Sequence, residues 1–314
     1  MSPSPKITVV GSINMDLVFR TPRIPVTGET ITGHQFVQIA GGKGANQAVA
    51  AARQGAKTTM IACVGDDAYG QQSLHGLQAD QIKTDHISII ADCATGVAGI
   101  MVDDRAQNII VIAPGANAKL SPQHIEQARS AITEADLLIC QCETPLDTVE
   151  AAIHLAHAHG VKVVFNPAPV IELPVGLLGK IDYLVVNETE AGQLSQIPVT
   201  DLSSAQSASR QLLSQGVRCV LLTMGEHGVC ATKATQPSEH FPALKVKAID
   251  TTAAGDTFVG AFAHAIGQGL ALHAAIEEAQ YCAALTVTKL GAQSSIPNRT
   301  ELEHFKAAQN NQSR

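Results

Sequence analysis

The sequence predicts an α/β fold in which a mostly parallel sheet carries helices on both faces. Two observations support this prediction. From about residue 120 onward, short apolar stretches rich in β-branched residues alternate with stretches of amphipathic helical pattern. Hydrophobic residues make up 45% of the 314 residues and charged residues only 16%, a balance that fills a large core.

Each predicted strand is short and apolar throughout, which is typical of a strand buried on both faces of a parallel sheet. In chain order, these strands cover residues 7–10, 59–62, 137–140, 161–165, 183–186 and 219–222. Further strands are expected at residues 229–232 and 244–249. Helices are expected at residues 48–54, which are rich in alanine, and at residues 148–157.

Three segments instead alternate polar and apolar residues, which predicts a small antiparallel sheet with one exposed face. They cover residues 29–37, 96–102 and 108–112, and residues 103–107 form a hairpin-like link between the last two. We expect this sheet to lie over the active site as a lid, within about residues 14–40 and 96–112. Its exposed face is a natural dimer contact. The chain is expected to form one domain over residues 1–308, followed by a polar, disordered tail at 309–314.

Composition and charge exclude several functions. The net charge is −7 and no run of lysine or arginine is present, so nucleic acid is not an expected partner. The seven cysteines are odd in number and contain no Cys-x-x-Cys, which indicates reduced thiols in a cytoplasm. Residues 1–6 lack a signal-peptide core, and no apolar run approaches the ~18 residues of a membrane span. We expect a soluble, cytoplasmic protein without a membrane partner.

Residues 41–47 (GGKGANQ) combine three glycines, a lysine and two carboxamides. Such a loop lets backbone and polar side chains approach a hydroxyl-rich ligand closely. It is not a Walker A loop, because Val37 stands where the first glycine belongs and Gly44 follows the lysine. The alternative is an ordinary strand-to-helix turn before the alanine-rich helix.

Residues 250–258 (DTTAAGDTF) connect the strand predicted at 244–249 to an apolar helix. The backbone N–H groups of Ala253, Ala254 and Gly255 are expected to be unpaired at the helix start, where they form an anion site. A carboxylate beside an anion site repels the anion unless it has a chemical task. Asp256 is therefore predicted to take a proton from a hydroxyl that attacks a phosphate, which indicates a small-molecule kinase. The alternative is an acidic residue favoured by the helix dipole alone.

Polar residues also follow other predicted strands at their carboxyl ends, where open α/β sheets bind ligands. Asn187 and Glu190 are placed to steer a hydrated Mg²⁺, or to form a capping box at a helix start. Residues 223–228 (TMGEHG) let backbone approach a nucleotide and also fit a hairpin turn; both can hold together.

Asn14 and Asp16 after the first strand, and Glu143 after strand 137–140, are suited to accept hydrogen bonds from sugar hydroxyls. A second group of polar residues is assigned no site. His154, His157 and His159 lie at a helix C-terminus, where they complement the dipole. Cys140 and Cys142 point to opposite faces and are expected to be structural.

Taken together, residues 11–16, 41–47, 166–169, 187–190, 250–258 and 291–295 resemble the phosphofructokinase-B, or ribokinase, family of carbohydrate kinases. The resemblance runs nearly end to end. It implies a ribokinase-like three-layer α/β/α sandwich with a small antiparallel β lid, and a homodimer formed through that lid. It also implies ATP-dependent phosphorylation of the 5-hydroxyl of D-ribose, a requirement for Mg²⁺, and activation by K⁺.

The resemblance assigns roles to individual residues. Those implied to hold the sugar are Asn14, Asp16, Gly42, Lys43, Asn46, Glu143 and Asp256. Those implied to bind ATP are Asn187, Thr223, Gly225, Gly228, Gly255 and Gln280. Asp256 is implied to be the base, Glu190 to order the hydrated Mg²⁺, and the amides of Ala253, Ala254 and Gly255 to form the anion hole. The implied K⁺ ligands are Asp250, the carbonyls of Thr252, Thr286, Lys289 and Gly291, and Ser295.

Two residues depart from the family pattern. Gln280 stands where the family can place a ring-bearing residue near adenine. Met15, between the two polar residues at the sugar, could alter the tolerance for 2-deoxyribose. A 2-deoxyribokinase therefore remains an alternative, and so does a nucleoside kinase, although an aromatic content of 3% with no Trp disfavours a slot for a base. A sugar sensor without activity would be expected to lack Asp256 or the anion hole, and both are present.

Overall fold

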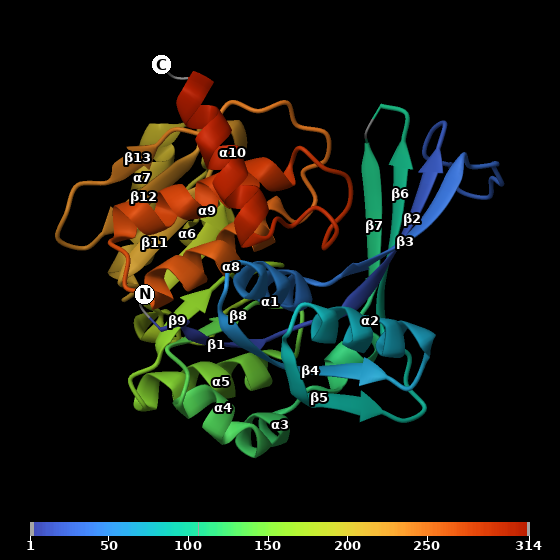
Figure 1. Ribbon diagram of the computed structural model, residues 1–314, viewed down its shortest axis with the longest axis horizontal. Helices are drawn as coiled ribbons and strands as arrows, with labels where there is room; N and C mark the ends of the chain where they lie inside the picture. The colour runs from blue at the N-terminus through green and yellow to red at the C-terminus, as the bar shows by residue number, and fades with distance from the viewer. Residues whose placement is uncertain (1–2, 106, 313–314) are drawn as a thin grey trace.

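The computed structural model describes residues 3–105 and 107–312 and shows a main sheet with helices on both faces (Figure 1). Within these residues, nine strands form the main sheet in the order β13-β12-β11-β10-β9-β8-β1-β4-β5. In chain order they are β1 (Lys6–Val10), β4 (Lys57–Gly65), β5 (Lys83–Ile90), β8 (Leu137–Cys140), β9 (Lys162–Phe165), β10 (Tyr183–Asn187), β11 (Cys219–Thr223), β12 (Val229–Lys233) and β13 (Glu239–Phe241). Neighbours from β5 to β11 run parallel, whereas the pairs β11–β12 and β12–β13 are antiparallel. The predicted α/β fold is confirmed.

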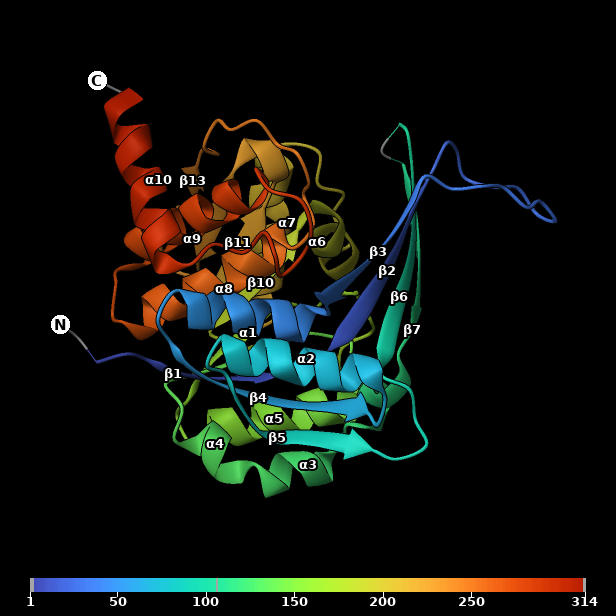
Figure 2. The same cartoon turned by 45° about the vertical axis from the view of Figure 1, so that its right-hand side comes forward.

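Two helical layers enclose this sheet (Figure 2). One layer contains α1 (Lys43–Arg53), α2 (Ala68–Ala79), α8 (Ala254–Gly267) and α9 (Leu272–Thr286), with α10 (Arg299–Gln312) packed on α9. The other contains α3 (Pro122–Gln127), α4 (Arg129–Thr133), α5 (Leu146–Ala158), α6 (Glu188–Ser195) and α7 (Leu202–Ser214). Because both faces of the strands are covered, alternate side chains of one strand enter two separate cores. Ile7 and Val9 belong to the first core, and Val10 to the second.

A second sheet of four strands projects from the edge of the body as a lid, seen at the right of Figure 1. Its order is β3-β2-β6-β7, with β2 (Asn14–Thr21), β3 (Gln35–Gly41), β6 (Gly96–Asp103) and β7 (Asn108–Ala113). Both edge pairs are antiparallel, as predicted. The central pair, β2 and β6, runs parallel, so the lid is not antiparallel throughout.

One lid strand, β3, lies later in the chain than the alternating pattern predicts. The strand predicted at 29–37 is observed as β3, which starts at Gln35. Pro22 and Pro25 lack the N–H that a ladder needs, and an ion pair between Arg23 and Glu29 closes the preceding segment into a loop. The predictions for residues 96–102 and 108–112 are confirmed by β6 and β7.

Other element predictions need correction. Residues 244–249 form no strand; the N–H of Ile249 donates to the carbonyl of Val287, at the C-terminal end of α9. Helix α1 starts at Lys43, not at residue 48, because Gly42 with φ of 88° ends the strand and opens the helix at once. No strand was predicted at the positions of β2, β5 or β13. Helix α10 includes residues 309–312, which the sequence analysis assigned to the polar tail.

Three further expectations concern membrane spans, cysteines and metal clusters. No helix of the described residues combines the length and the apolar character that a bilayer span requires. All seven cysteines are free thiols, and burial raises the pKa of Cys142 to about 12, in agreement with a structural role. Cys140 and Cys142 both belong to the second core, so the expectation that they point to opposite faces is wrong. Residues two apart on a strand face the same side. No group of three or more His, Cys, Asp or Glu side chains in this part of the chain is placed to hold a metal ion.

Candidate active site

A cavity of about 150 Å³ lies where the carboxyl ends of β9, β10 and β11 meet the N-termini of α1 and α8. Its polar lining comes from residues far apart in the sequence: Lys43, Asn166, Asn187, Glu190, Thr223 and Asp256. Parallel strands bring their carboxyl ends to one edge of the sheet, so the fold assembles the predicted motifs here.

The Asp256 carboxylate is fixed by two carboxamides from α1. Asn46 Nδ2 donates to Asp256 Oδ2 at 2.9 Å, and Gln47 Nε2 donates to Asp256 Oδ1 at 2.9 Å. The residue is only 9% exposed. The two N–H donors fix the direction of the lone pairs that the carboxylate has left. Asp256 is thereby held ready to accept a proton.

Behind this pair lies a second set of amides that the sequence analysis did not assign to the site. Gln47 Oε1 accepts a hydrogen bond from Gln141 Nε2 at 2.7 Å, and Gln47 Nε2 also lies 3.1 Å from Asn166 Oδ1. Asn166 Nδ2 in turn donates to the carbonyl of Val185 at 3.0 Å. The chain of amides leaves Gln47 one orientation. Gln47 and Asn166 stand in motifs that carry the family resemblance, and this signal could have identified them. Gln141 stands in no such motif.

Residues 43–47 belong to the first turn of α1 and do not form the loop that their glycines suggest. Gly44 allows this turn to press against the end of β1, since a Cβ there would lie 2.6 Å from the backbone N of Ser12. The N–H of Ala45 donates to the carbonyl of Ser12 at 2.9 Å. The contact places Lys43 and Asn46 beside the residues that follow the first strand.

The start of α8 supports the predicted anion site in part. Ala253 has φ of 60°, a left-handed conformation that costs a non-glycine residue about 1 kcal/mol or more. The N–H groups of Ala253 and Gly255 have no partner in the described residues, and both residues line the cavity beside Asp256. The N–H of Ala254, however, donates to the carbonyl of Thr251 at 3.3 Å. The expectation of three unpaired amides is therefore wrong for Ala254.

The residues predicted to hold the sugar lie around the N-terminus of α1. Asn14 is buried, and its Oδ1 accepts a hydrogen bond from Asn117 Nδ2 at 2.7 Å, which leaves its NH₂ group for a ligand. Glu143 Oε2 accepts hydrogen bonds from Ser12 Oγ at 2.5 Å and from the N–H of Lys43 at 3.1 Å. A Cβ on Gly41 would lie 2.4 Å from Asp16 Oδ2, so only glycine leaves room for that carboxylate.

Carboxylates outnumber cations in this part of the site. Burial, with the nearby Glu143 and Asp256 carboxylates, raises the pKa of Asp16 to about 7. Burial by itself would lower the pKa of Lys43, but the surrounding carboxylates outweigh it and raise that pKa. Near neutral pH, Lys43 is therefore charged, and Asp16 is close to the midpoint of its titration. Ionising Asp16 among the other carboxylates lowers the folding stability of the protein free of substrate.

We expect Asp16→Asn to stabilise the protein free of substrate. The folded pKa of Asp16, about 7, lies above its unfolded value of 3.8, so ionisation costs folding free energy as the pH rises between these values. The melting temperature of the variant should exceed that of the unmodified protein by roughly 5–8 °C at pH 8. The difference should be roughly half as large at pH 5.5.

Thermal unfolding at both pH values measures this effect. Asp85→Asn, which removes an exposed carboxylate, serves as the control and should leave the melting temperature unchanged. An Asp16→Asn variant that is no more stable than the unmodified protein at pH 8 contradicts the assigned pKa shift.

The residues predicted for ATP are only partly free to bind it. Asn187 and Glu190 form the capping box of α6: Asn187 N–H donates to Glu190 Oε2 at 2.9 Å, and Glu190 N–H to Asn187 Oδ1 at 2.8 Å. Glu190 keeps its second carboxylate oxygen, and burial raises its pKa. The capping interpretation is confirmed, and it leaves one oxygen available for a hydrated cation.

Two glycines after β11 have different roles. Gly225 has φ of 52° and its Cβ position is open, so backbone there can approach a ligand. Gly228 has φ of 92°, and a Cβ there would lie 1.9 Å from the carbonyl oxygen of Phe241. Gly228 thus serves the β11–β12 hairpin. Gln280 also serves the fold, because its Nε2 donates to the carbonyls of Phe241 and Pro242 at 3.1 and 3.2 Å.

The residues predicted around K⁺ lie on two segments that Asp250 joins. Asp250 Oδ1 accepts hydrogen bonds from the N–H and Oγ1 of Thr252 at 2.9 and 2.6 Å, and Oδ2 accepts one from the N–H of Gly291 at 3.0 Å. The carbonyls of Thr252, Lys289 and Gly291 receive no hydrogen bond from described residues, whereas that of Thr286 accepts the N–H of Lys289 at 3.0 Å. Free carbonyls beside a carboxylate are the hard oxygen donors that a K⁺ ion requires, so most of these residues fit it.

A comparison with known families agrees with this geometry. The model of the pfkB family carbohydrate kinases matches residues 4–299. The chain belongs to this family of carbohydrate kinases. It is therefore a kinase that acts on a carbohydrate hydroxyl, as the geometry around Asp256 suggests.

Individual relatives narrow the comparison. The chain is 44% identical to a ribokinase of Schizosaccharomyces pombe, over 95% of this chain and 96% of that protein. It is also 44% identical to a ribokinase of Haemophilus influenzae, over 95% and 97%. A deoxyribokinase of Salmonella typhi is 38% identical, over 95% and 98%. A structure of Arabidopsis thaliana ribokinase complexed with ribose and ATP superposes with a TM-score of 0.91 at 30% identity, covering 96% of this chain and 99% of that one.

Proposed function

We propose that this kinase transfers the γ-phosphoryl group of ATP to the 5-hydroxyl of D-ribose and releases D-ribose 5-phosphate. The observation that carries the proposal is the Asp256 carboxylate, held by two carboxamides beside free backbone N–H groups. The 44% sequence identity of this chain to each of two ribokinases supports ribose as the sugar. The deoxyribokinase relative is less similar, at 38%.

The proposed reaction moves one proton and one phosphoryl group. Asp256 accepts the proton of the 5-hydroxyl, whose oxygen forms a bond to the γ-phosphorus. The bond from that phosphorus to the β–γ bridging oxygen breaks, and ADP leaves with the electron pair. The N–H groups of Ala253 and Gly255, with the Lys43 ammonium, lie where negative charge must be stabilised during the transfer.

The sugar and nucleotide occupy opposite sides of Asp256 in this proposal. Asn14, Asp16 and Glu143 hold the sugar hydroxyls, together with Gly42, Lys43 and Asn46. The segment around Thr223 and Gly225 approaches the nucleotide. The lid covers the sugar and excludes water, which would otherwise take the phosphoryl group.

Two cations complete the proposed site. Glu190 would hold Mg²⁺ through water, and Mg²⁺, when bound, supplies charge neutralisation to the phosphates. Asp250, the free carbonyls beside it and Ser295 would hold K⁺, which keeps the segment before α8 in shape and adds positive potential. All cysteines in the described residues are free thiols, which supports the proposed cytoplasmic location.

ADP release, measured with a panel of pentoses and nucleosides, tests the substrate. We expect D-ribose to give the highest kcat/KM, with 2-deoxyribose lower because one hydroxyl partner is lost. The free polar groups of Asn14 and Asp16 make this loss costly. A higher kcat/KM with 2-deoxyribose or with a nucleoside would contradict the proposal.

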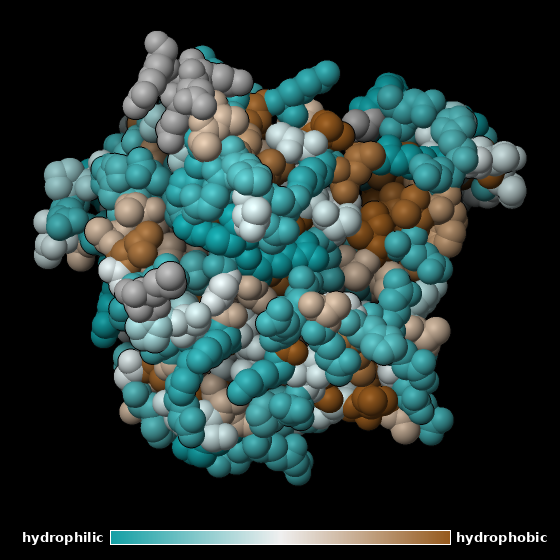
Figure 3. Space-filling view, in the orientation of Figure 1, coloured by the Kyte–Doolittle hydropathy of each residue, from teal (hydrophilic) through white to brown (hydrophobic). Residues whose placement is uncertain are grey.

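We also propose that two copies of the chain associate through their lids. Strand β7 is an edge strand, and four consecutive apolar side chains on it, Ile109 to Ile112, are exposed. Phe19, Phe36 and Met101 extend this exposed area over the other lid strands. Figure 3 shows hydrophobic residues gathered over the lid, with hydrophilic residues around them. Unpaired edges and apolar patches of this kind are rarely left in water.

Val111→Lys is expected to convert the proposed dimer to a monomer, because a charged side chain from each copy would enter the interface. Sedimentation velocity measures the change. Val175→Lys is the matched control, since Val175 is also exposed but lies in the loop between β9 and β10, outside the lid strands. A dimer that persists in Val111→Lys, or a monomeric unmodified protein, contradicts association through β7.

A further inference from the structure

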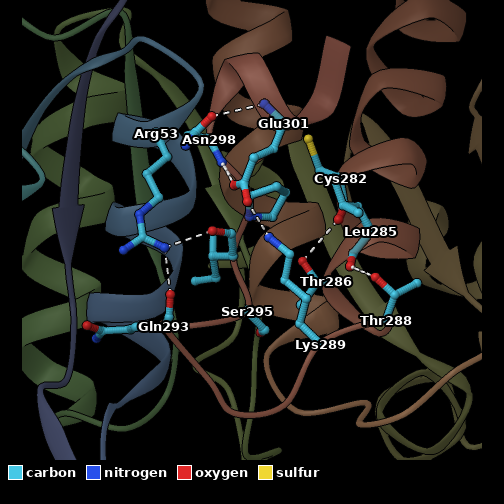
Figure 4. Close-up of polar contacts among 12 residues, drawn as sticks. Arg53, Cys282, Leu285, Thr286, Thr288, Lys289, Gln293, Ser295, Asn298 and Glu301 are labelled. Carbon is cyan, nitrogen blue, oxygen red and sulfur yellow. Dashed lines mark hydrogen bonds and ion pairs between the residues drawn. The ribbon is translucent and has the colours of Figure 1, made fainter. Parts of the chain in front are cut away.

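The connection between α9 and α10 contains the segment 289–296, here called the cation loop, which carries three of the proposed K⁺ ligands. These are Lys289, Gly291 and Ser295. The loop has no regular secondary structure, so side chains from other elements must hold its carbonyls in place. Figure 4 shows the polar contacts that do so.

Arg53, the last residue of α1, makes the central contact. Its Nη1 donates to the carbonyl of Gln293 at 2.6 Å and to the carbonyl of Ile296 at 2.7 Å. These two carbonyls flank Ser295, which is fully buried. A guanidinium can bond both at once because its donors are coplanar and fixed in direction.

The charge of Arg53 does not oppose a cation in the loop. Asp80 binds the other side of the guanidinium, with Nε to Oδ1 at 2.8 Å and Nη2 to Oδ2 at 3.0 Å. This bidentate pair neutralises Arg53 and aims Nη1 toward the loop. Gln54, the next residue, adds a buried hydrogen bond from Nε2 to the carbonyl of Pro297 at 2.9 Å.

The other end of the cation loop is held independently. Lys289 Nζ pairs with Glu301 Oε1 at 2.6 Å, and Glu301 also caps α10 by accepting the N–H of Asn298 at 2.9 Å. Gly291 is held by Asp250, as described above. Each proposed ligand in the loop therefore lies close to a side chain that fixes the loop by a hydrogen bond or an ion pair. Of these side chains, Arg53 is the one that comes from α1, the helix that also carries residues proposed to hold the sugar.

Helix α1 connects the contacts of Arg53 with the cation loop to the active site. Gln47, which holds Asp256, precedes Arg53 by six residues, which corresponds to roughly 9 Å of rigid helix. All residues of α1 from Gly44 to Ala51 are buried, so the helix cannot shift at one end alone. The cation loop and the Asp256 carboxylate are thus positioned by the same helix.

We propose that Arg53 is a positioning residue that sets the affinity of the cation loop for K⁺. This inference rests on the proposed K⁺ site, and it goes beyond it by naming a residue outside the ligand set. Without the two hydrogen bonds from Arg53, the loop around Ser295 is less ordered before K⁺ binds. Binding must then order the loop, which weakens the affinity for K⁺.

Thermal unfolding in KCl and in NaCl at equal ionic strength, without sugar or ATP, tests the proposal. The unmodified protein should melt at a higher temperature in KCl. The rise of the melting temperature as K⁺ replaces Na⁺ at constant ionic strength gives the dissociation constant for K⁺. In Arg53→Gln this dissociation constant should rise about fivefold or more, the expected effect of losing hydrogen bonds from a charged donor. Arg53→Lys presents a single ammonium to the two carbonyls and should show the same change if Arg53→Gln does not fold.

Arg218→Gln is the matched control. Arg218 forms an ion pair with Asp182 at 3.0 Å and has no contact with the loop, so its loss should leave the dissociation constant for K⁺ unchanged. An Arg53 variant with the unmodified dissociation constant overturns the inference, even if its overall stability is lower. An unmodified protein that responds equally to KCl and NaCl overturns the K⁺ site itself, and with it the inference, while sugar-dependent ADP release still tests the kinase function.

Discussion

Asp256→Asn is expected to lower kcat by ~10²–10⁴-fold, the usual contribution of a positioned general base. The carboxamide keeps the shape of the carboxylate but cannot take the hydroxyl proton. It also places an NH₂ group against the NH₂ groups of Asn46 or Gln47, which now hold the carboxylate oxygens. Apart from Asp256 itself, the residues proposed to hold the sugar are not substituted, so the dissociation constant for ribose should change less than kcat.

Steady-state kinetics, ribose binding by calorimetry and thermal unfolding together measure this result. Asp147→Asn is the matched control, because Asp147 is an exposed acidic residue in the first turn of α5. If Asp256 served only the helix dipole, both variants would lose a little stability and neither would lose activity. Near-normal turnover in a folded Asp256→Asn protein would show that the base assignment is wrong.

Gly260→Ala is expected to lower both stability and activity. Gly260 lies at the contact between α8 and α1, and a Cβ there would lie 2.4 Å from the carbonyl oxygen of Gln47 and 2.8 Å from the N of Ala51. The helices must separate, at a cost of typically ~1–3 kcal/mol for an overpacked core. Since α8 carries Asp256 and α1 carries its two carboxamide partners, the separation should also lower kcat by about 10²-fold.

Gly76→Ala provides the comparison for this substitution. Gly76 is also a helical glycine, in α2, but no atom lies within 4 Å of its Cβ position. Its replacement should raise stability by up to about 1 kcal/mol through helix propensity, with unchanged kinetics. If Gly260→Ala retains full kcat at a temperature where it is folded, the close contact between α1 and α8 is not required for catalysis.

Much of the sheet could be predicted from the sequence because its strands are buried on both faces. An uninterrupted apolar stretch such as residues 137–140 has few other stable placements, and the observed strand has the same bounds. Exposed or half-exposed segments were less certain. Residues 244–249 alternate like a strand, but no strand of either sheet pairs with them in the described residues.

The candidate site was partly predictable, for a related reason. Lys43, Asn46 and Asp256 stand in dense local motifs, and the structure places them around one cavity or in direct contact. Gln141 and Arg53 stand in no such motif, and their roles depend on partners 94 and 240 residues away. Contacts of that range depend on how helices pack, and a single sequence shows this poorly.

The proposed reaction is tested most directly by identifying the product made from ATP, Mg²⁺ and D-ribose, by phosphorus and carbon NMR. We expect D-ribose 5-phosphate in equal amount to ADP with the unmodified protein, and a greatly reduced amount of both with Asp256→Asn. Release of inorganic phosphate without a sugar phosphate, or phosphate on another ribose hydroxyl, would contradict it.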